Sequence, residues 1–238
     1  MEKLQADIYQ TFILKDNYLY FIKGLRITLI VTALALILGV VLGLLVAIVR
    51  SAHDQQPMNK RGLVLRVLNG ICKVYLTVIR GTPMMVQLLI MWFVIWNTRA
   101  TDGNLICCAV ISFGINSGAY VAEIVRSGIM SIDKGQMEAG RSLGLNYVKT
   151  MRFIIIPQAF KNVLPALGNE LITLLKETSI VTVIGLKDLT KGAMIVQANT
   201  YQAFVPFFGI AIMYLALVML LTWLLGKMER RLRQSDIR

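Results

Sequence analysis

Residues 131–157 read SIDKGQMEAGRSLGLNYVKTMRFIIIP and form the longest stretch of the chain that is too polar to lie in lipid. Apolar segments long enough to cross a membrane flank it on both sides. Its charged residues are Asp133, Lys134, Glu138, Arg141, Lys149 and Arg152. The sequence therefore predicts a polar loop between membrane spans, which we call the 131–157 loop.

Capping signals predict a short helix at the start of this loop. Asp133 and Gln136 have the spacing of a capping box, with Asp in place of Ser or Thr. Leu143-Gly144 predicts the end of the helix, because glycine readily adopts the left-handed conformation just after a helix.

A second short helix is expected to follow. Asn146 can cap its start, and it should end before Pro157, because the residue before a proline disfavours helical geometry. Two short helices joined at a glycine could dock into a groove on another protein. An ordinary polar loop is the alternative.

The composition indicates a membrane protein of one domain. Hydrophobic residues make up 56% of the 238 residues and the mean hydropathy is +0.66, against roughly 45–50% apolar residues in soluble domains. The net charge of +12 lies between the apolar runs and not in one tract, which fits the positive-inside rule better than nucleic-acid binding.

Few residues are available for metal or covalent chemistry. Cys72, Cys107 and Cys108 fit neither a disulfide framework nor a zinc site, and His53 is the single histidine. The sequence contains neither a Walker A nor a dinucleotide-binding motif. If ATP drives this protein, another chain supplies the ATP site.

The apolar runs predict an all-α integral membrane protein with five transmembrane helices. A mixed N-terminal segment at residues 1–23 suits the membrane interface, and residues 24–226 form the transmembrane domain. The basic tail at residues 227–238 is expected in the cytoplasm with the 131–157 loop, which places the N-terminus outside. The spans are expected at about residues 25–49, 66–97, 105–125, 161–185 and 204–226.

Two spacings stand out in the first two spans. Gly39 and Gly43 form a Gly-xxx-Gly pair that permits close helix packing. Arg66, Lys73 and Arg80 recur every seven residues and share one helical face, after which glycine and proline predict a kink. Snorkelling at a membrane edge is favoured for these cations over a specific contact.

Polar residues inside the predicted spans are the candidates for a substrate pathway, because such residues are costly in lipid. Glu123 has an alternative interpretation as an ion pair with Arg126 at i, i+3. Glu170 has no cation at helical spacing, so it is a candidate to attract a cationic substrate. The pathway candidates are Asn116, Tyr120, Glu123, Asn169, Glu170 and Thr173.

The 131–157 loop resembles the EAA loop of bacterial ABC-importer permeases. The pattern Glu138-Ala139-Gly140, then Gly144, then 154–157 as Ile-Ile-Ile-Pro matches its spacing, with Gly140 replacing the second alanine and Ile156 a leucine. Gly140 is expected to loosen the helix by up to about 1 kcal/mol relative to alanine. Residues 80–88 (RGTPMMVQL) and 168–179 (GNELITLLKETS) resemble the polar-amino-acid branch of the same family.

This resemblance implies a MetI-like permease fold of a type I ABC importer and a multi-pass protein of the bacterial inner membrane. It implies a permease subunit without catalytic activity or a cofactor of its own, while ATP and Mg²⁺ bind to a partner ATPase. The implied partners are a second permease, identical or different, two ATPases, an extracytoplasmic binding protein and a polar amino acid. The implied ATPase-coupling residues are Gln136, Glu138, Ala139, Gly140, Arg141, Leu143 and Gly144.

Two other classes of protein remain as alternatives. A self-sufficient secondary carrier or channel would need an ion-coupling site, and the chain shows no internal inverted repeat. A structural membrane scaffold would leave the polar residues of the fourth span without a purpose. Co-purification with an ATPase separates the three.

Overall fold

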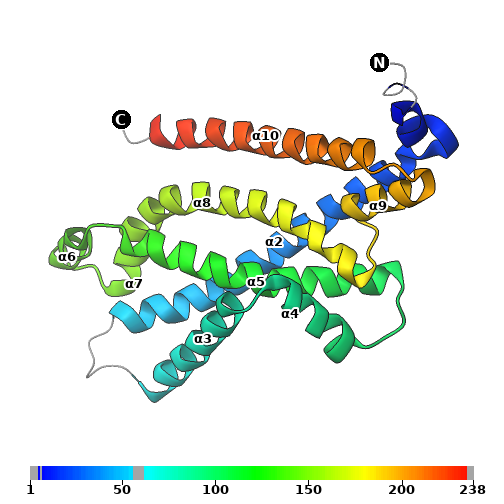
Figure 1. The fold of residues 1–238 in the computed structure, drawn as a ribbon. Coiled ribbons are helices and arrows are strands. Elements are labelled where there is room, and N and C mark those ends of the chain that lie inside the picture. The colour runs from blue at the N-terminus through cyan, green and yellow to red at the C-terminus, as the bar shows by residue number, and fades with distance from the viewer. Residues whose placement is uncertain (1–4, 6, 56–61, 235–238) are drawn as a thin grey trace. The chain divides into compact units, whose positions relative to one another are not determined.

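All the regular secondary structure is helical in the part that the computed structural model describes, namely residue 5, residues 7–55 and residues 62–234 (Figure 1). This confirms the all-α class for that part. The elements in chain order are η1 (Tyr9–Ile13), η2 (Leu14–Asp16), α2 (Tyr18–Gln55), α3 (Leu63–Gly81), α4 (Met84–Ile90), η4 (Met91–Trp96), α5 (Asp102–Met130), α6 (Lys134–Ser142), α7 (Tyr147–Thr150), η5 (Met151–Ile155), α8 (Ile156–Glu177), η6 (Thr178–Ile184), α9 (Leu189–Thr200) and α10 (Phe204–Gln234).

Three of these helices are long and apolar enough to cross a membrane: α2, α5 and α10. The pair α3 and α4–η4 gives a fourth candidate if it is taken as one broken span. Helix α8, the expected fourth span, does not reach the same apolar threshold in the described residues, because polar side chains interrupt it. The structure thus supports three or four spans by length and composition, where the sequence predicted five.

The predicted kink in the second span is confirmed. Helix α3 ends at Gly81 and α4 begins at Met84, with Thr82 and Pro83 in extended conformation between them. The Pro83 carbonyl accepts the N–H groups of Val86 and Gln87 and so starts the new helix.

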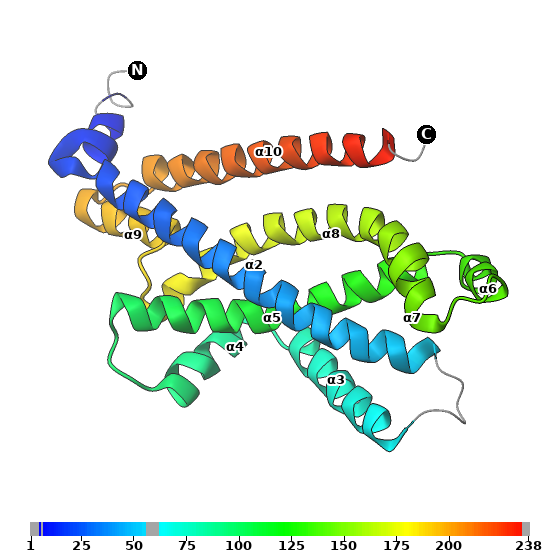
Figure 2. The same ribbon diagram turned by 180° about the vertical axis from the view of Figure 1, so that it is seen from behind.

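Some predicted segments fall partly outside the described residues. These are residues 1–4 and 6 of the N-terminal segment, residues 56–61 of the loop after the first span, and residues 235–238 of the tail. Figure 2 shows α2 as one continuous helix, which extends to Gln55 and so beyond the expected end of the first span. The tail is helical as far as Gln234.

The chain divides into two compact units, with one boundary at the break between α3 and α4 and the others inside α2, α5, α8 and α10. Unit 1 comprises residues 1–36, 83–113 and 171–224, and unit 2 comprises residues 37–82, 114–170 and 225–238. Each unit has its own buried apolar clusters, and we describe each by itself.

Unit 1 has a large core in which α2, α4, η4, α5, α8 and η6 each contribute buried side chains, among them Phe113 and Trp92. A second cluster joins α2, α9 and α10 around Phe21, Leu189 and Ile210. Gly24 allows α2 to approach the start of α9, because a Cβ there would lie 2.5 Å from the Asp188 carbonyl oxygen.

Unit 2 joins α2, α3, α5 and α8 through small buried residues such as Ala47, Ala119 and Ala122. A Cβ on Gly39 would lie 2.9 Å from the Ser117 side chain, and one on Gly43 would lie 2.5 Å from Val121. The predicted close packing at the Gly-xxx-Gly pair is therefore confirmed, and its partner is α5.

The expectation that the second short helix ends before Pro157 is wrong. Helix α7 continues through the π-helical turn η5 into α8, and Pro157 is the second residue of α8. Proline is tolerated in a first helical turn, where its missing N–H is not needed. The wider π turn just before it changes the hydrogen-bond spacing at this point.

Candidate functional site

The polar residues of α5 in unit 2 lie three or four positions apart, so they share one helical face. Asn116 is buried, whereas Tyr120 is 40% exposed. The guanidinium carbon of Arg80, from α3, lies 5.6 Å from the centre of the Tyr120 ring, which is a cation–π distance. This face of α5 therefore meets a cation from α3.

Glu123 is bound by two arginines. Arg126 donates from Nε and Nη2 to the two carboxylate oxygens, each at 3.2 Å. Arg80 Nη1 lies 3.6 Å from Oε2 of the same carboxylate. The predicted i, i+3 ion pair is confirmed, and the contact with Arg80 is specific where snorkelling was favoured. Arg126 also lies 3.9 Å from Asp54.

Glu170 has a different environment. The Ser117 hydroxyl donates to its Oε1 at 2.7 Å, which joins α5 to α8 within unit 2. The pathway candidates predicted from the sequence include Asn116 but not its neighbour Ser117. The signal was its place in the same polar run of α5.

The other pathway candidates are placed as follows. Asn169 is exposed beside Glu170 in unit 2. Thr173 is also exposed, but it belongs to unit 1. The structure thus brings together Asn116, Tyr120 and Glu123 on α5 and links α5 to Glu170 through Ser117.

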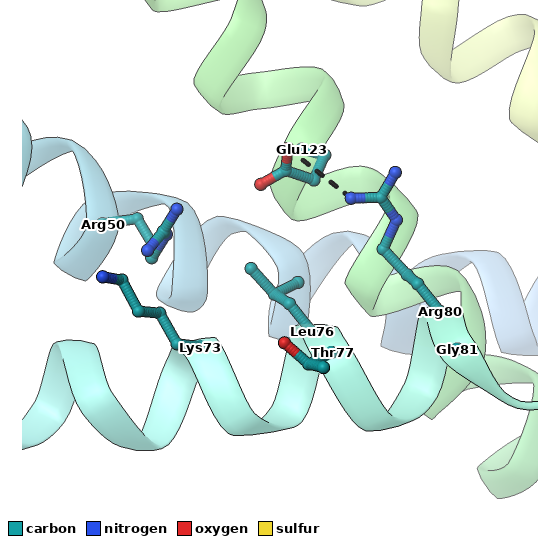
Figure 3. A pocket seen from close by; sticks show the side chains of 7 residues that line it. All are labelled: Arg50, Lys73, Leu76, Thr77, Arg80, Gly81 and Glu123. Carbon is teal, nitrogen blue, oxygen red and sulfur yellow. Dashed lines mark ion pairs between the residues drawn. The ribbon is translucent and has the colours of Figure 1, made fainter.

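A cavity of about 420 Å³ opens beside Glu123 (Figure 3). It lies within unit 2, between α2, α3 and α5. Three of its lining side chains are cationic and one is a carboxylate. The lining residues are Arg50, Lys73, Leu76, Thr77, Arg80, Gly81 and Glu123.

The 131–157 loop also lies in unit 2, where α6 and α7 sit at one end of α8 (Figure 1). The Asp133 carboxylate caps α6 by accepting the Gly135 N–H at 2.6 Å. The reciprocal half of the predicted capping box is absent among the described residues, since Gln136 Oε1 accepts from Gln158 at 3.4 Å instead. Asn146 caps α7 by accepting the Lys149 N–H at 2.9 Å, as predicted.

The end of α6 follows the predicted glycine stop. Gly144 has φ +80°, a conformation that strongly favours glycine. The Leu145 N–H bonds to the Gly140 carbonyl and the Gly144 N–H to that of Arg141, which together make a Schellman motif. Leu143 is 80% exposed at this bend.

Gly140 is a packing position in α6. It is buried, and a Cβ there would lie 2.6 Å from the Thr150 side chain and 3.1 Å from that of Ile154. The absent side chain thus lets α6 rest on α7 and η5. Of the predicted coupling residues only Gly140 is buried; Gln136, Glu138, Ala139, Arg141, Leu143 and Gly144 are all exposed.

Comparison with known proteins identifies a matching family. The model of the family described as "Binding-protein-dependent transport system inner membrane component" matches residues 62–234. The arginine transport system permease protein ArtQ of Bacillus subtilis strain 168 is 38% identical over 217 residues, which is 91% of this chain and 94% of ArtQ. The glutamine transport system permease protein GlnP of Escherichia coli K12 is 35% identical, over 89% of this chain and 92% of GlnP.

Solved structures agree with these relatives. A crystal structure of an amino acid ABC transporter with histidines has a chain that is 42% identical, with a TM-score of 0.78 over 89% of this chain and 94% of that one. The inward-facing MetNI methionine ABC transporter matches with a TM-score of 0.75 over 92% of this chain and 99% of that one. At 19% identity, the second match shows the fold alone.

Proposed function

We propose, on the premise that this chain belongs to the family of binding-protein-dependent transport system inner membrane components, that its 131–157 loop couples the membrane helices to a partner ATPase. The chain is the permease subunit of an ABC amino acid importer and has a MetI-like fold. It is a transport subunit of the inner membrane, and an ATPase and a binding protein belong to the same system.

The exposed surface of α6 and the bend after it support the coupling role. Leu143 and Val148 are apolar and 80% and 68% exposed, although they lie in the most polar stretch of the chain. Exposed apolar side chains on a rigid, well-capped element are typical of a protein interface. In this proposal they enter a groove on the ATPase, with Glu138 and Arg141 at its rim.

Five crossings with the N-terminus outside remain the proposed topology. Helices α2 and α10 expose large apolar side chains along their length, such as Ile37, Ile48 and Ile212, as lipid-facing helices do. Helix α8 would be the fourth crossing in chain order, with its polar residues turned to protein or to a watery path. The basic tail would then share the cytoplasmic side with the 131–157 loop.

A second copy of this permease or a related one, together with two ATPases that bind ATP and Mg²⁺, completes the proposed assembly. The binding protein delivers a polar amino acid, as the names of the arginine and glutamine permeases suggest. Closure of the ATPases would move the two 131–157 loops together and open the path outward. Residues 154–157, where η5 runs without a break into α8, offer a rigid link for that movement.

The proposed pathway uses the polar side chains of α5 and α8. Glu170 is its proposed anionic group, a carboxylate that the Ser117 hydroxyl holds between α5 and α8. A cationic amino acid would bind there through charge-assisted hydrogen bonds. Asn116, Tyr120, Asn169 and Thr173 supply polar surface, while Glu123, held by two arginines, is the least available of the set.

The substitution Leu143→Glu tests the coupling role. It adds a charge to the exposed bend without touching the strained backbone at Gly144. We expect the reconstituted complex to lose substrate uptake by more than about tenfold, which corresponds to roughly 1.4 kcal/mol of coupling, while the permease still inserts. Thr98→Glu, which adds the same charge to an exposed loop of unit 1, should leave uptake unchanged. Normal coupling in Leu143→Glu would overturn the proposal.

A further inference from the structure

The cavity of unit 2 holds more positive charge than its carboxylate can neutralise. Arg50, Lys73 and Arg80 line it together with one acid, Glu123. Glu123 already accepts two hydrogen bonds from Arg126 and lies 3.6 Å from Arg80. The charge of Glu123 is therefore shared between Arg126 and Arg80.

The two remaining cations, Arg50 and Lys73, form no ion pair with a carboxylate in the part of the chain that the structure describes. Arg50 Nη1 reaches only a neutral amide, Asn69 Oδ1, at 3.3 Å. The Nε of Arg50 is buried and has no hydrogen-bond partner among the described residues. Lys73 likewise forms no ion pair with any residue that the structure describes. A buried donor without an acceptor is costly, which points to a group that the protein itself does not supply.

The side chains converge from three helices, α2, α3 and α5 (Figure 3). Arg50 of α2 and Lys73 of α3 extend toward each other at one end of the cavity, whereas Arg80 and Glu123 meet at the other. Thr77 lies one turn beyond Lys73 on α3 and adds a hydroxyl to the same lining. Two facing cations repel each other unless an anion lies between them.

We propose that this cavity binds a phosphate group between Arg50 and Lys73. An arginine fork and a lysine point charge are the side chains that proteins use for phosphate. The Arg50 Nε–H group and the Thr77 hydroxyl add two hydrogen-bond donors, so that several phosphate oxygens can be bound at once. A zwitterionic amino acid fits less well, because Glu123, the group that would hold its ammonium, is already bound to two arginines.

The neighbouring face of α3 favours a phosphate that carries hydrocarbon chains. Val67, Ile71, Val74 and Val78 lie at three- and four-residue spacing and are all more than half exposed. Acyl chains could lie along this stripe while the headgroup phosphate occupies the cavity. The ligand chemistry is thus a phosphate monoester or diester, with an anionic phospholipid and free inorganic phosphate as its two sources. Only the lipid source depends on the proposed topology.

The experiment compares lipid and phosphate binding by the purified transporter with its ATPase subunits. The complex is placed in nanodiscs of phosphatidylcholine, in nanodiscs that also contain phosphatidylglycerol, and in phosphatidylcholine nanodiscs with inorganic phosphate. Native mass spectrometry counts the retained phosphatidylglycerol, and isothermal titration calorimetry measures phosphate binding. The variants are Arg50→Gln, Lys73→Gln and Lys73→Arg, with Arg66→Gln as the control of equal charge on the same face of α3.

We expect retained phosphatidylglycerol to fall about tenfold in Lys73→Gln and in Arg50→Gln, and to recover in Lys73→Arg. Arg66→Gln should retain as much as the unchanged protein. Binding of inorganic phosphate with the same dependence on Arg50 and Lys73, and no selective lipid retention, would support the site with free phosphate as its ligand. Equal phosphatidylglycerol and phosphate binding by Lys73→Gln, or equal losses in Arg66→Gln, would overturn the proposal.

Discussion

The 131–157 loop and the pair of carboxylates Glu123 and Glu170 both lie in unit 2, yet the surroundings of their polar side chains differ. In the loop, hydrogen bonds cap both ends of α6 and the start of α7, whereas side chains such as Leu143 and Glu138 are exposed. Around α5, carboxylates are bonded to arginines or to a serine hydroxyl.

This difference indicates that the loop has its binding partner outside the chain, whereas the two carboxylates have bonding partners within unit 2. A rigid backbone that presents exposed side chains is suited to binding another protein, whereas carboxylates bonded within the unit are suited to work inside the membrane. Within the second region, Glu123 contacts two arginines and Glu170 accepts a hydrogen bond from Ser117. Substitutions in both regions test these two roles.

The largest expected effect follows from Glu170→Gln. Removing the charge should reduce uptake of a basic amino acid about 10- to 100-fold, the equivalent of a hydrogen bond to a charged group at roughly 1.5–3 kcal/mol. Vesicle uptake with radiolabelled arginine and glutamine measures it, and glutamine uptake should suffer less. Unchanged uptake of basic amino acids would remove Glu170 from the pathway. Ser117→Ala is the matched control for loss of the hydrogen bond with the charge retained.

Arg126→Gln should act on stability and leave substrate choice unchanged. It leaves Glu123 with Arg80 alone, and because these side chains are a quarter or more exposed we expect a cost of about 1 kcal/mol. Thermal unfolding in detergent measures the loss. The double variant Arg126→Gln with Glu123→Gln should recover part of it. A change in substrate preference would contradict the structural role of this pair.

Gly144→Ala should weaken coupling by a few-fold. At φ +80° a Cβ costs roughly 1–2 kcal/mol, which favours a different bend after α6. Uptake per ATP hydrolysed is the readout. Gly62→Ala, at an exposed glycine with φ −61° and no atom near its Cβ, should be neutral. Equal behaviour of the two alanine variants would show that the bend does not position the loop.

The smallest expected effect concerns Asp188 of unit 1, another carboxylate that accepts hydrogen bonds within its own unit. Its buried carboxylate caps α9 by accepting the N–H groups of Thr190 and Lys191, and burial raises its pKa from 3.8 to about 6. The folded state thus binds the proton more tightly than the unfolded state. This contribution to stability is present below pH 4 and is lost as the pH rises to about 6. Asp188→Asn should flatten the pH dependence of the melting temperature in that window, and a persistent slope would assign it to another group.

The sequence predicted the features that depend on local chemistry. The caps at Asp133 and Asn146, the glycine stop at Gly144 and the break before Met84 all follow from rules that apply within a few residues, and each was confirmed. The ion pair of Glu123 with Arg126 belongs to the same group, because i, i+3 residues of one helix are neighbours.

Contacts between helices could not be predicted in the same way. Arg80 reaching Glu123, Ser117 bonding Glu170 and Thr150 filling the space beside Gly140 depend on how separate helices pack. Pro157 was misjudged for a related reason, because a π turn upstream let the helix continue through it. The pathway role of α8 likewise remains a proposal, because the function of its polar residues depends on which other helices they face.

The most direct test of the account is a crosslink from the bend of the 131–157 loop. In a variant whose Cys72, Cys107 and Cys108 are replaced by alanine, Leu143→Cys is alkylated with a maleimide that carries a benzophenone and is then irradiated, in intact cells and in inside-out vesicles. The account predicts a covalent product with the ATPase subunit, and no labelling of this cysteine by an impermeant maleimide applied outside intact cells. Labelling from outside, or a loop that never crosslinks to the ATPase in an active complex, would contradict it.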